Sequence, residues 1–429
     1  MNHLVYWVWL SLRCGAGSEL GTFLLKHFSD PKEIYEADEK ALLSIKGVTQ
    51  EIADALMDKD LVYPQKIVEY CERVNVGILT LESSNYPERL RSIYAKPLVL
   101  YYRGRLPNID GNVLIACVGT RTCSESGHQN AYRLGQDLAH AGAIVVSGMA
   151  SGIDTAAQMG ALDARGHTIA VLGCGIDRVY PPQNGKLMEK IARTGTVLTE
   201  YAPGTEPFGK NFPIRNRIIS GLSQGTVVVE ANARSGSLIT ANYAQKQGRD
   251  IFAFPGTVDA PHATGTNALI KRGAKLVTCA EDVLEEYELL YPDRIFTEQI
   301  ATENYRRRTE PLKKNAENEA VQAEIEEAPH KEKTARALIK KKRAKAVPTA
   351  KEEPAVSDQP IKASEQCEDP YCREVLSVMH DAMSVEEIAS ALSEKNGAPR
   401  DIASILGALT MLEIEEFAEA LPGGLYRRR

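Results

Sequence analysis

The chain has 429 residues, of which 43% are hydrophobic and 25% charged, and its formal net charge at pH 7 is −6. The apolar run at residues 4–10 is far shorter than the roughly 20 residues that a membrane span needs, and it lacks the basic lead-in of a secretory signal. The eight cysteines are scattered, which fits a reducing compartment. We therefore expect a cytoplasmic protein of about two to four domains, without a membrane segment or structural disulfides.

The acidic net charge hides a division along the chain. Residues 201–275 contain nine Lys and Arg against four Asp and Glu, whereas residues 366–429 contain six against twelve. A polyanion such as nucleic acid would therefore bind to the middle of the chain rather than to its end.

Residues 1–80 are expected to form a small helical domain. Apolar residues flank a tight turn at Gly47, and a helix rich in small residues follows it. This pattern resembles the helix-hairpin-helix unit of SAM-like domains, and Gly15 and Gly17 mark a related turn upstream. The backbone N–H groups of such a turn can contact a phosphate. Only Lys46 adds a positive charge beside the turn, so a pure packing role stays open.

Residues 81–290 have the pattern of a doubly wound α/β domain. Short runs of Val, Ile, Leu and Ala alternate with segments of helix length, which is typical of parallel strands that are buried on both faces. The expected strands cover residues 113–118, 143–146, 168–172, 196–199, 226–229, 250–254 and 275–278, and another within 96–104 leads into them. The sequence therefore predicts an α/β fold with an extended Rossmann-like, mostly parallel sheet.

Five glycine-bearing segments follow these strands directly. Ligands of doubly wound sheets bind outside the carboxyl ends of the strands, so we expect the five segments to line one edge. They are Gly119-Thr120-Arg121, residues 147–152 beginning with Ser147-Gly148, Gly173-Cys174-Gly175, Arg234-Ser235-Gly236-Ser237 and Pro255-Gly256-Thr257. The segment 234–237 lies just before an expected helix, where backbone N–H groups and the helix dipole favour an anion.

The remaining segments are expected to be a linker and a small terminal domain. Residues 291–366 are rich in Glu, Lys, Ala and Pro, a composition that predicts a flexible charged linker. Residues 367–429 show helical patterns followed by a short hairpin, which resembles a winged helix. Its expected third helix, 399–412, carries only Arg400 as a basic residue, so we favour a protein-interaction role over duplex binding.

The motifs of nucleotide-dependent and metal-dependent enzymes are incomplete. Residues 204–211 nearly match a phosphate-binding loop, but Asn211 stands where a hydroxyl should bind magnesium. Residues 173–178 begin a dinucleotide fingerprint and lack its third glycine. Cys367 and Cys372 have no second pair of zinc ligands nearby in the sequence. We therefore expect no cofactor, no metal and no catalytic residue.

Cationic and aromatic residues indicate binding instead. Arg121 comes shortly after the first glycine that follows a strand, and its guanidinium group can donate two parallel hydrogen bonds to a phosphate. A structural ion pair with a carboxylate is the alternative role for this arginine. Phe212 stands between Lys210 and Arg215, and an aromatic ring flanked by basic side chains is typical of sites that bind single-stranded nucleic acid. Alternatively, Phe212 could form a hydrophobic staple at the start of the following helix. Arg215 and Arg217 point in nearly opposite directions on a helix, so one should contact the ligand and the other brace the loop.

Five motifs, in this order, resemble the bacterial DNA-processing protein A family (DprA, also called Smf). They are Gly119-Thr120-Arg121, residues 147–154, 173–181, 212–221 and 234–240. The similarity covers roughly residues 80 to 290, and the helical start and the winged-helix end fit the accessory domains of the family.

The resemblance implies a single-stranded DNA-binding protein that is not an enzyme. It would protect incoming DNA during natural transformation, help to load the RecA recombinase in recombination, and form a homodimer through the Rossmann-like domain. By motif match, Arg121, Lys210, Phe212 and Arg215 would contact DNA. Many relatives carry a DNA-binding lysine where this chain has Gln183, and Lys186 is the expected substitute.

The complete set of candidate DNA-binding residues combines the loops with the matched motifs. It comprises Gly119, Thr120, Arg121, Ser147, Gly148, Lys186, Lys210, Asn211, Phe212, Arg215, Arg217, Arg234, Ser235, Gly236 and Ser237.

Two other functions stay open. The sheet also resembles, more distantly, the lysine-decarboxylase-like nucleoside-phosphate hydrolases, in which Glu230 would be the catalytic carboxylate. A pure protein scaffold is the third possibility, and it predicts that no oligonucleotide is retained.

Overall fold

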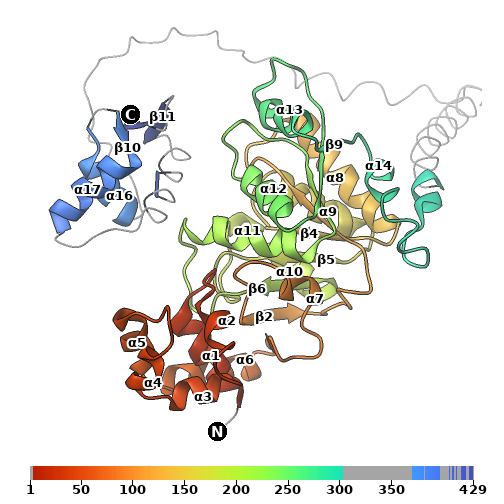
Figure 1. The fold of residues 1–429 in the computed structure, drawn as a ribbon. Coiled ribbons are helices and arrows are strands. Elements are labelled where there is room, and N and C mark those ends of the chain that lie inside the picture. The colour runs from red at the N-terminus through yellow and green to blue at the C-terminus, as the bar shows by residue number, and fades with distance from the viewer. Residues whose placement is uncertain are drawn as a thin grey trace, which may run out of the picture.

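The computed structural model describes residues 3–302 and parts of the C-terminal region, namely 370–380, 382–396, 405, 408, 409, 412, 417–421 and 425–428. Figure 1 shows the N-terminal helices in red, the central sheet with its helices in orange to green, and the C-terminal elements in blue. The predicted linker from residue 303 onward, Cys367 and most of the expected helix at 399–412 lie outside the described residues. Within the described ranges, no helix is both long and apolar enough to cross a membrane.

The N-terminal part is a bundle of short helices, as predicted. Its elements are α1 (His3–Cys14), α2 (Leu20–Leu24), α3 (Pro31–Glu36), α4 (Glu39–Leu43), α5 (Gln50–Met57) and α6 (Val62–Arg73). The turn between α4 and α5 passes through Gly47, whose φ of 107° is strained for any residue with a Cβ atom. Asp30, Asp38 and Thr49 cap the N-termini of α3, α4 and α5 with their side chains.

The helical bundle packs directly against the sheet. The Trp9 side chain and the α1 residues around it are buried in one core together with Val99, Tyr101 and Val197 of the sheet. Gly21 lies so close to Leu98 that an added Cβ atom would be 2.2 Å from a Leu98 methyl group. The helical bundle and the α/β domain therefore share one hydrophobic core.

The central sheet has nine strands in the order β1-β2-β6-β5-β4-β3-β7-β8-β9. Their bounds are β1 (Gly77–Thr80), β2 (Val99–Gly104), β3 (Leu114–Val118), β4 (Ile144–Ser147), β5 (Thr168–Val171), β6 (Thr196–Thr199), β7 (Gly225–Val228), β8 (Asp250–Ala253) and β9 (Lys275–Leu276). Strands β3 to β9 pair with one another in the parallel sense, whereas β2 pairs antiparallel with both β1 and β6. The predicted mostly parallel, Rossmann-like sheet is confirmed. It begins at Gly77, before the boundary expected at residue 80.

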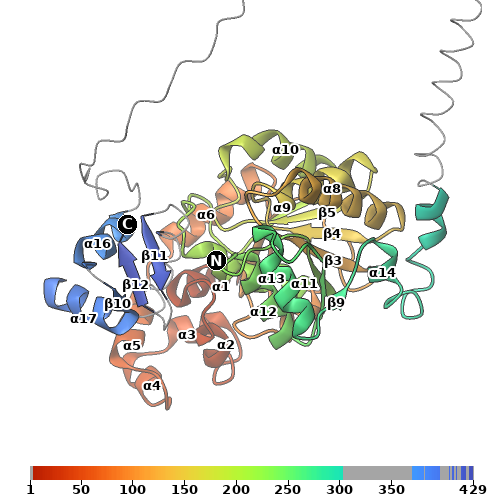
Figure 2. The same ribbon diagram turned by 90° about the horizontal axis from the view of Figure 1, so that it is seen from above.

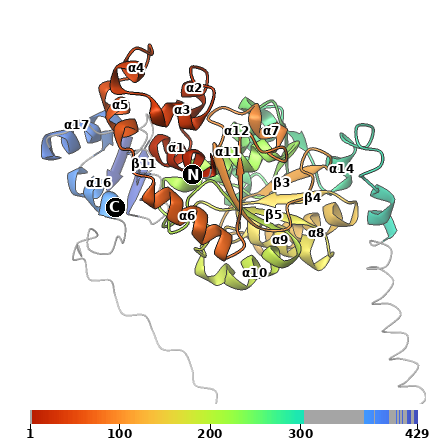
Figure 3. The same ribbon diagram turned by 90° about the horizontal axis from the view of Figure 1, so that it is seen from below.

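Alternate residues of β3 face two different cores, which is why its sequence is apolar throughout. Ile115 and Cys117 pack against α8 (Glu125–His140) and α9 (Ile153–Asp163), whereas Leu114 and Ala116 lie on the opposite face. On that face α7 (Glu88–Arg91), α11 (Asn211–Leu222) and α12 (Ser237–Lys246) cover the sheet. Figures 2 and 3 show these two helical layers on either side of the strands.

The remaining elements extend the two layers. They are η1 (Pro182–Asn184), α10 (Gly185–Thr194), η2 (Pro261–Ala263), α13 (Thr264–Lys271) and α14 (Glu281–Leu284). Beyond α14 the side chains of Ile295 and Ile300 are still buried in the core beneath α8 and α9. The packed part of the chain therefore continues past residue 290, where the linker was expected to begin.

The strand order changes direction beside β3. The chain runs outward from β3 through β4, β5 and β6, and then returns to the other side of β3 as β7. Such a switch point leaves a crevice between the loops that follow the two neighbouring strands, and ligands of doubly wound sheets bind there. The loops after β3 and β7 are the segments that carry Arg121 and Arg234.

The C-terminal part contains two described helices and a three-stranded sheet in the order β10-β12-β11. Their bounds are α16 (Pro370–Val378), β10 (Met383–Ser384), α17 (Val385–Asn396), β11 (Ala418–Leu421) and β12 (Leu425–Arg428). The predicted capping box at the start of α17 is present, because Ser384 and Glu387 exchange hydrogen bonds. The winged-helix assignment stays a prediction, since the expected third helix is mostly undescribed.

Candidate nucleic-acid interface

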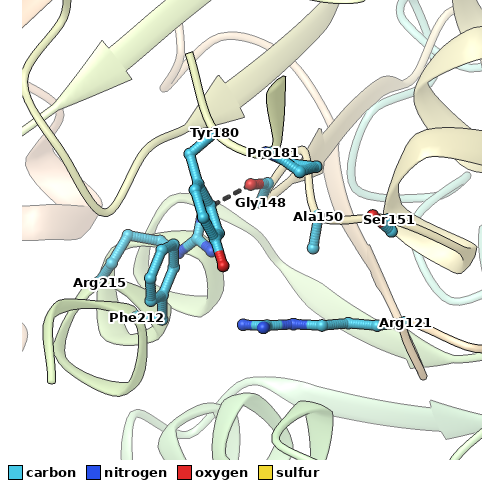
Figure 4. Close-up of a pocket in the computed structure, with 8 residues that line it drawn as sticks. All are labelled: Arg121, Gly148, Ala150, Ser151, Tyr180, Pro181, Phe212 and Arg215. Carbon is cyan, nitrogen blue, oxygen red and sulfur yellow. Dashed lines mark hydrogen bonds between the residues drawn. The ribbon is translucent and has the colours of Figure 1, made fainter. Parts of the chain in front are cut away.

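A small cavity of about 40 Å³ opens where the loops after β3, β4 and β5 meet the start of α11. Figure 4 shows its walls, which are formed by Arg121, Gly148, Ala150, Ser151, Tyr180, Pro181, Phe212 and Arg215. Parallel strands bring their carboxyl ends to one edge, so residues from four separate segments of the chain converge here.

Two aromatic rings and a guanidinium group form the centre of this cavity. The Arg121 guanidinium carbon lies 5.4 Å from the centre of the Phe212 ring, within the range of a cation–π contact. The Tyr180 ring lies 4.9 Å from the Phe212 ring and is tilted by 38° against it. Figure 4 shows Arg121 extending from the opposite wall toward both rings. The arrangement offers flat apolar faces beside a positive charge.

Phe212 is fixed by close packing at its back. Only 8% of the residue is exposed, and Gly173 lies so near that an added Cβ atom would be 2.8 Å from ring carbon Cδ1. A side chain at position 173 would therefore displace the ring. The glycine that resembled part of a dinucleotide fingerprint instead makes room for the aromatic side chain.

Arg215 is buried beneath the cavity and holds two loops together. Its Nη1 donates to the carbonyl of Gly148 at 2.8 Å and also to the carbonyl of Val171. Gly148 in turn donates its N–H to Oδ2 of the buried Asp154 at 3.0 Å. The guanidinium group therefore connects the backbone just after β4 with the last residue of β5.

The charge of Arg215 persists at neutral pH. Burial lowers the pKa of the guanidinium group to about 10, which is still far above neutrality. Burial also raises the pKa of Asp154, although the positive charge of Arg215 opposes this shift. Arg215 thus adds a permanent positive charge below the rings while only 3% of the residue is exposed.

A second and larger cavity of about 520 Å³ occupies the switch point itself, and its volume is in the range typical of ligand sites. Gly119, Thr120 and Arg121 line it on the β3 side, and residues 234–237 line it on the β7 side. The ten-residue helix α12 starts at Ser237, so the positive end of its dipole lies at this wall. Because Arg121, Phe212 and Arg215 line both cavities, the two form one continuous groove.

Arg217 points away from this groove into a buried ion pair. Its Nη2 donates to both carboxylate oxygens of Glu200 at 2.7 Å, and both side chains are almost fully buried. Glu200 also accepts a weak hydrogen bond of 3.5 Å from the backbone of Gly17 in the helical bundle. Of the two arginines that the sequence left undecided, Arg215 lies at the groove and Arg217 braces α11 against its surroundings.

The structure divides the predicted site residues into two groups. Ten of them line the groove, namely Gly119, Thr120, Arg121, Gly148, Phe212, Arg215, Arg234, Ser235, Gly236 and Ser237. The described walls do not include the other five, which are Ser147, Lys186, Lys210, Asn211 and Arg217.

Three of the five residues outside the walls have structural contacts instead, and one of them is Arg217 with its ion pair to Glu200. Ser147 donates its hydroxyl to the carbonyl of Cys117, and Asn211 is buried with its side-chain amide 3.4 Å from the carbonyl of Glu206. Lys186 and Lys210 are exposed, on α10 and beside the first turn of α11. Ser147 and Asn211 therefore support the backbone around the groove, and the two lysines lie outside its walls.

The sequence prediction missed Tyr180 and Pro181. Both follow β5 in a long loop that has no hydrophobic period, so their direction could not be inferred from the pattern. The available signal was an aromatic residue in a loop at the same sheet edge as the glycine segments. Asn216 and Asn232 also line the larger cavity and were likewise missed.

Glu230, the carboxylate on which the hydrolase alternative depends, is engaged at the start of α8. Its Oε2 accepts the N–H of Ser124 at 2.9 Å, and its Oε1 accepts the hydroxyl of Ser124 at 2.5 Å. Neither cavity wall, as far as the chain is described, includes this residue. Its carboxylate is therefore directed at a helix terminus and not into the groove.

Comparison with known proteins shows the family of the chain. The model of the DNA recombination-mediator protein A family matches residues 77–288. Protein Smf from Synechocystis is 38% identical over 283 residues, which cover 65% of this chain and 71% of that protein. The chain belongs to the DNA recombination-mediator protein A family. The resemblance inferred from the five sequence motifs is thereby confirmed, and the family match spans every strand of the nine-stranded sheet.

Two further members of the DNA recombination-mediator protein A family illustrate the extent of the similarity. DNA processing protein DprA from Streptococcus pneumoniae is 46% identical over 203 residues, which cover 47% of this chain and 71% of that protein. A solved structure on the single-stranded DNA binding mode of DNA processing protein A from Helicobacter pylori is 31% identical. It covers 50% of this chain and 97% of its own, with a TM-score of 0.46.

Proposed function

We propose that this chain binds single-stranded DNA in the groove between the loops after β3 and β7, and that it acts as a binding protein and not as an enzyme. The observation that carries the proposal is the cluster of Arg121, Phe212 and Tyr180. Binding of single strands combines base stacking on aromatic rings with positive charges that follow the backbone. Duplex DNA hides its base faces, so these rings favour an unpaired strand.

The chemistry of the groove assigns a role to each wall. A base stacks on the Phe212 ring, and the Arg121 guanidinium contacts an adjacent phosphate with its fork of donors. A further phosphate lies at the start of α12, where the helix dipole and segment 234–237 favour an anion. Lys210 and Lys186 are exposed beyond the walls and extend the basic surface along the strand.

Fluorescence anisotropy with a labelled oligonucleotide and its duplex tests this function. We expect tight binding of the single strand and weaker binding of the duplex. The Phe212→Ala variant should lose roughly 5- to 150-fold in affinity, because stacking contributes about 1–3 kcal/mol per base. Arg133→Ala is the matched control, since this arginine is exposed on α8 outside the groove. Equal binding of both nucleic acids, or none, would overturn the proposal.

We further propose that the bound strand is handed to a RecA-type recombinase and that the chain works as a homodimer in the cytoplasm. Family membership supports these roles. Adding the chain to recombinase and a single strand coated with single-strand-binding protein should shorten the lag before recombinase ATP hydrolysis. An unchanged lag would refute the loading role, and a monomer mass in light scattering would refute the dimer.

A further inference from the structure

The loop that carries Arg121 is held on both sides by a single residue. The N–H of Thr120, just before Arg121, donates to the backbone carbonyl of Glu230 at 2.8 Å. The N–H and the hydroxyl of Ser124, just after the loop, donate to the two carboxylate oxygens of the same glutamate at 2.9 and 2.5 Å. Arg121 therefore lies between two attachments to Glu230.

The side-chain attachment is built into the fold. Glu230 lies two residues after the end of β7, the strand next to β3, and its carboxylate lies at the N-terminus of the 16-residue helix α8. Ser124 caps this helix by accepting the N–H of Gly127 at 2.9 Å. A Cβ atom at Gly127 would be only 2.2 Å from the carboxyl carbon of Glu230, so the glycine admits the carboxylate. The positive end of the helix dipole stabilises its charge.

A third contact, with Gly152, restrains the backbone of the loop at Arg121. Gly152, at the start of α9, has a φ of 77°, and an added Cβ atom would lie 2.6 Å from the carbonyl oxygen of Arg121. The backbone of Arg121 is thus packed against α9 on one side and tied to Glu230 before and after. The direction of the Arg121 side chain toward Phe212 depends on this backbone conformation.

Electrostatics and geometry make opposite predictions for Glu230. A carboxylate near a groove for polyanions repels phosphate, so its removal should strengthen binding if charge alone mattered. Loss of the Ser124 hydrogen bonds frees the loop, so removal should weaken binding if the position of Arg121 mattered. We propose that Glu230 is a positioning residue for single-stranded DNA binding, which acts by holding Arg121 in its binding conformation. This inference rests on the proposed function.

A double-mutant cycle between Glu230 and Arg121 tests the inference in the full-length chain. Glu230→Ala should weaken single-strand binding by about tenfold, in line with couplings between residues of one network. It should also reduce the salt slope as Arg121→Ala does, since the same phosphate contact is lost. In the Arg121→Ala background, Glu230→Ala should change the affinity by less than about twofold.

The conservative variant separates hydrogen bonding from charge. In Glu230→Gln the amide oxygen accepts the Ser124 N–H and the amide nitrogen donates to the Ser124 hydroxyl, so we expect binding within about threefold of the unchanged chain. Ser124→Ala keeps one of the two bonds and should have an intermediate effect. Thermal unfolding of each variant verifies that it is folded. If Glu230→Ala does not fold, Ser124→Ala is used in the cycle in its place.

Three outcomes decide between the explanations. Tighter or unchanged binding by Glu230→Ala would overturn the positioning role and leave the proposed function intact. An equal loss in both backgrounds would also overturn it, because the two residues would then act independently. Failure of the unchanged chain to bind a single strand would refute the proposed function, and the positioning role with it.

Discussion

The Arg121 guanidinium carbon lies 5.4 Å from the centre of the Phe212 ring, although one residue follows β3 and the other lies in the first turn of α11. The guanidinium carbon of Arg215 lies 5.7 Å from the same ring. The ring is therefore in contact with two positive charges that come from different elements. A base that stacks beside this ring enters a site where the charge of its own phosphate is compensated.

Tyr180 should contribute to binding as a second aromatic wall. Its ring contacts Phe212 at 4.9 Å, so Tyr180→Ala removes a stacking surface and should weaken single-strand binding about 5-fold or more. The salt slope should stay unchanged, because no charge is lost. Tyr94→Ala is the control, since this tyrosine is 72% exposed and is not part of either cavity wall among the described residues. An equal effect of the two substitutions would contradict the role of Tyr180.

Arg217 should matter for stability and not for DNA contact. Arg217→Met leaves the buried carboxylate of Glu200 without its partner, which typically costs about 3–5 kcal/mol of the free energy of unfolding. The double variant Glu200→Gln, Arg217→Met removes both charges and should regain much of this loss. Urea unfolding measures the effect, and anisotropy should give an unchanged affinity for the folded single variant. Selective loss of DNA affinity at full stability would show that Arg217 contacts the strand.

His167 should make the protein less stable in mild acid. Thr196 donates its hydroxyl to the carbonyl of Arg105, so Nε2 of His167 is the donor in its 3.0 Å hydrogen bond to Thr196. Burial, together with the positive charge of Arg105, lowers the pKa of His167 from 6.5 to about 4. Between these pH values the unfolded chain binds a proton that the folded chain does not. The free energy of unfolding therefore decreases by up to ~3 kcal/mol as the pH is lowered from 6.5 to about 4.

The variant His167→Gln isolates this contribution, because glutamine keeps a donor and does not titrate. Its free energy of unfolding should depend less on pH than that of the unchanged chain between pH 6.5 and about 4. Parallel stability curves for the two proteins across this window would contradict the assigned shift.

Deleting residues 366–429 should not weaken single-strand binding. These residues carry six basic against twelve acidic side chains, and Glu419 lies at the wall of the larger cavity. Removing them takes negative charge away from the groove, so the affinity should stay equal or rise. Titration of the same oligonucleotide at fixed salt measures the change. A several-fold loss of affinity on deletion would show that the C-terminal part itself binds the single-stranded DNA.

Apolar patterning located the sheet well. All seven expected parallel strands are present as β3 to β9. The signal is a continuous apolar run in β3 to β7, whose residues are all buried. The edge strand β1 was not expected, since it has four residues, begins with Gly77 and is only half-buried at its start. Four residues of this kind carry too little periodicity for β1 to be recognised.

The loops of the site were predictable from topology, but the directions of side chains were not. Segments 119–121 and 234–237 line the groove because parallel strands end at one edge. Arg215 and Arg217 differ by two positions on one helix, and only the packing of α11 decides which one meets the groove. Glu230 was a candidate catalytic carboxylate only through the distant resemblance to nucleoside-phosphate hydrolases, and its contact with Ser124, 106 residues earlier, could not be inferred from the sequence.

The salt dependence of single-strand affinity, measured for the unchanged chain and for Arg121→Ala, tests the account most directly. The logarithm of the association constant should fall linearly with the logarithm of salt concentration, with a slope of about −0.7 for each phosphate contacted. Arg121→Ala should bind about tenfold more weakly, and its slope should be smaller in magnitude by about 0.7. Identical affinity and slope for the two proteins across the salt series would contradict a groove in which Arg121 holds the DNA backbone.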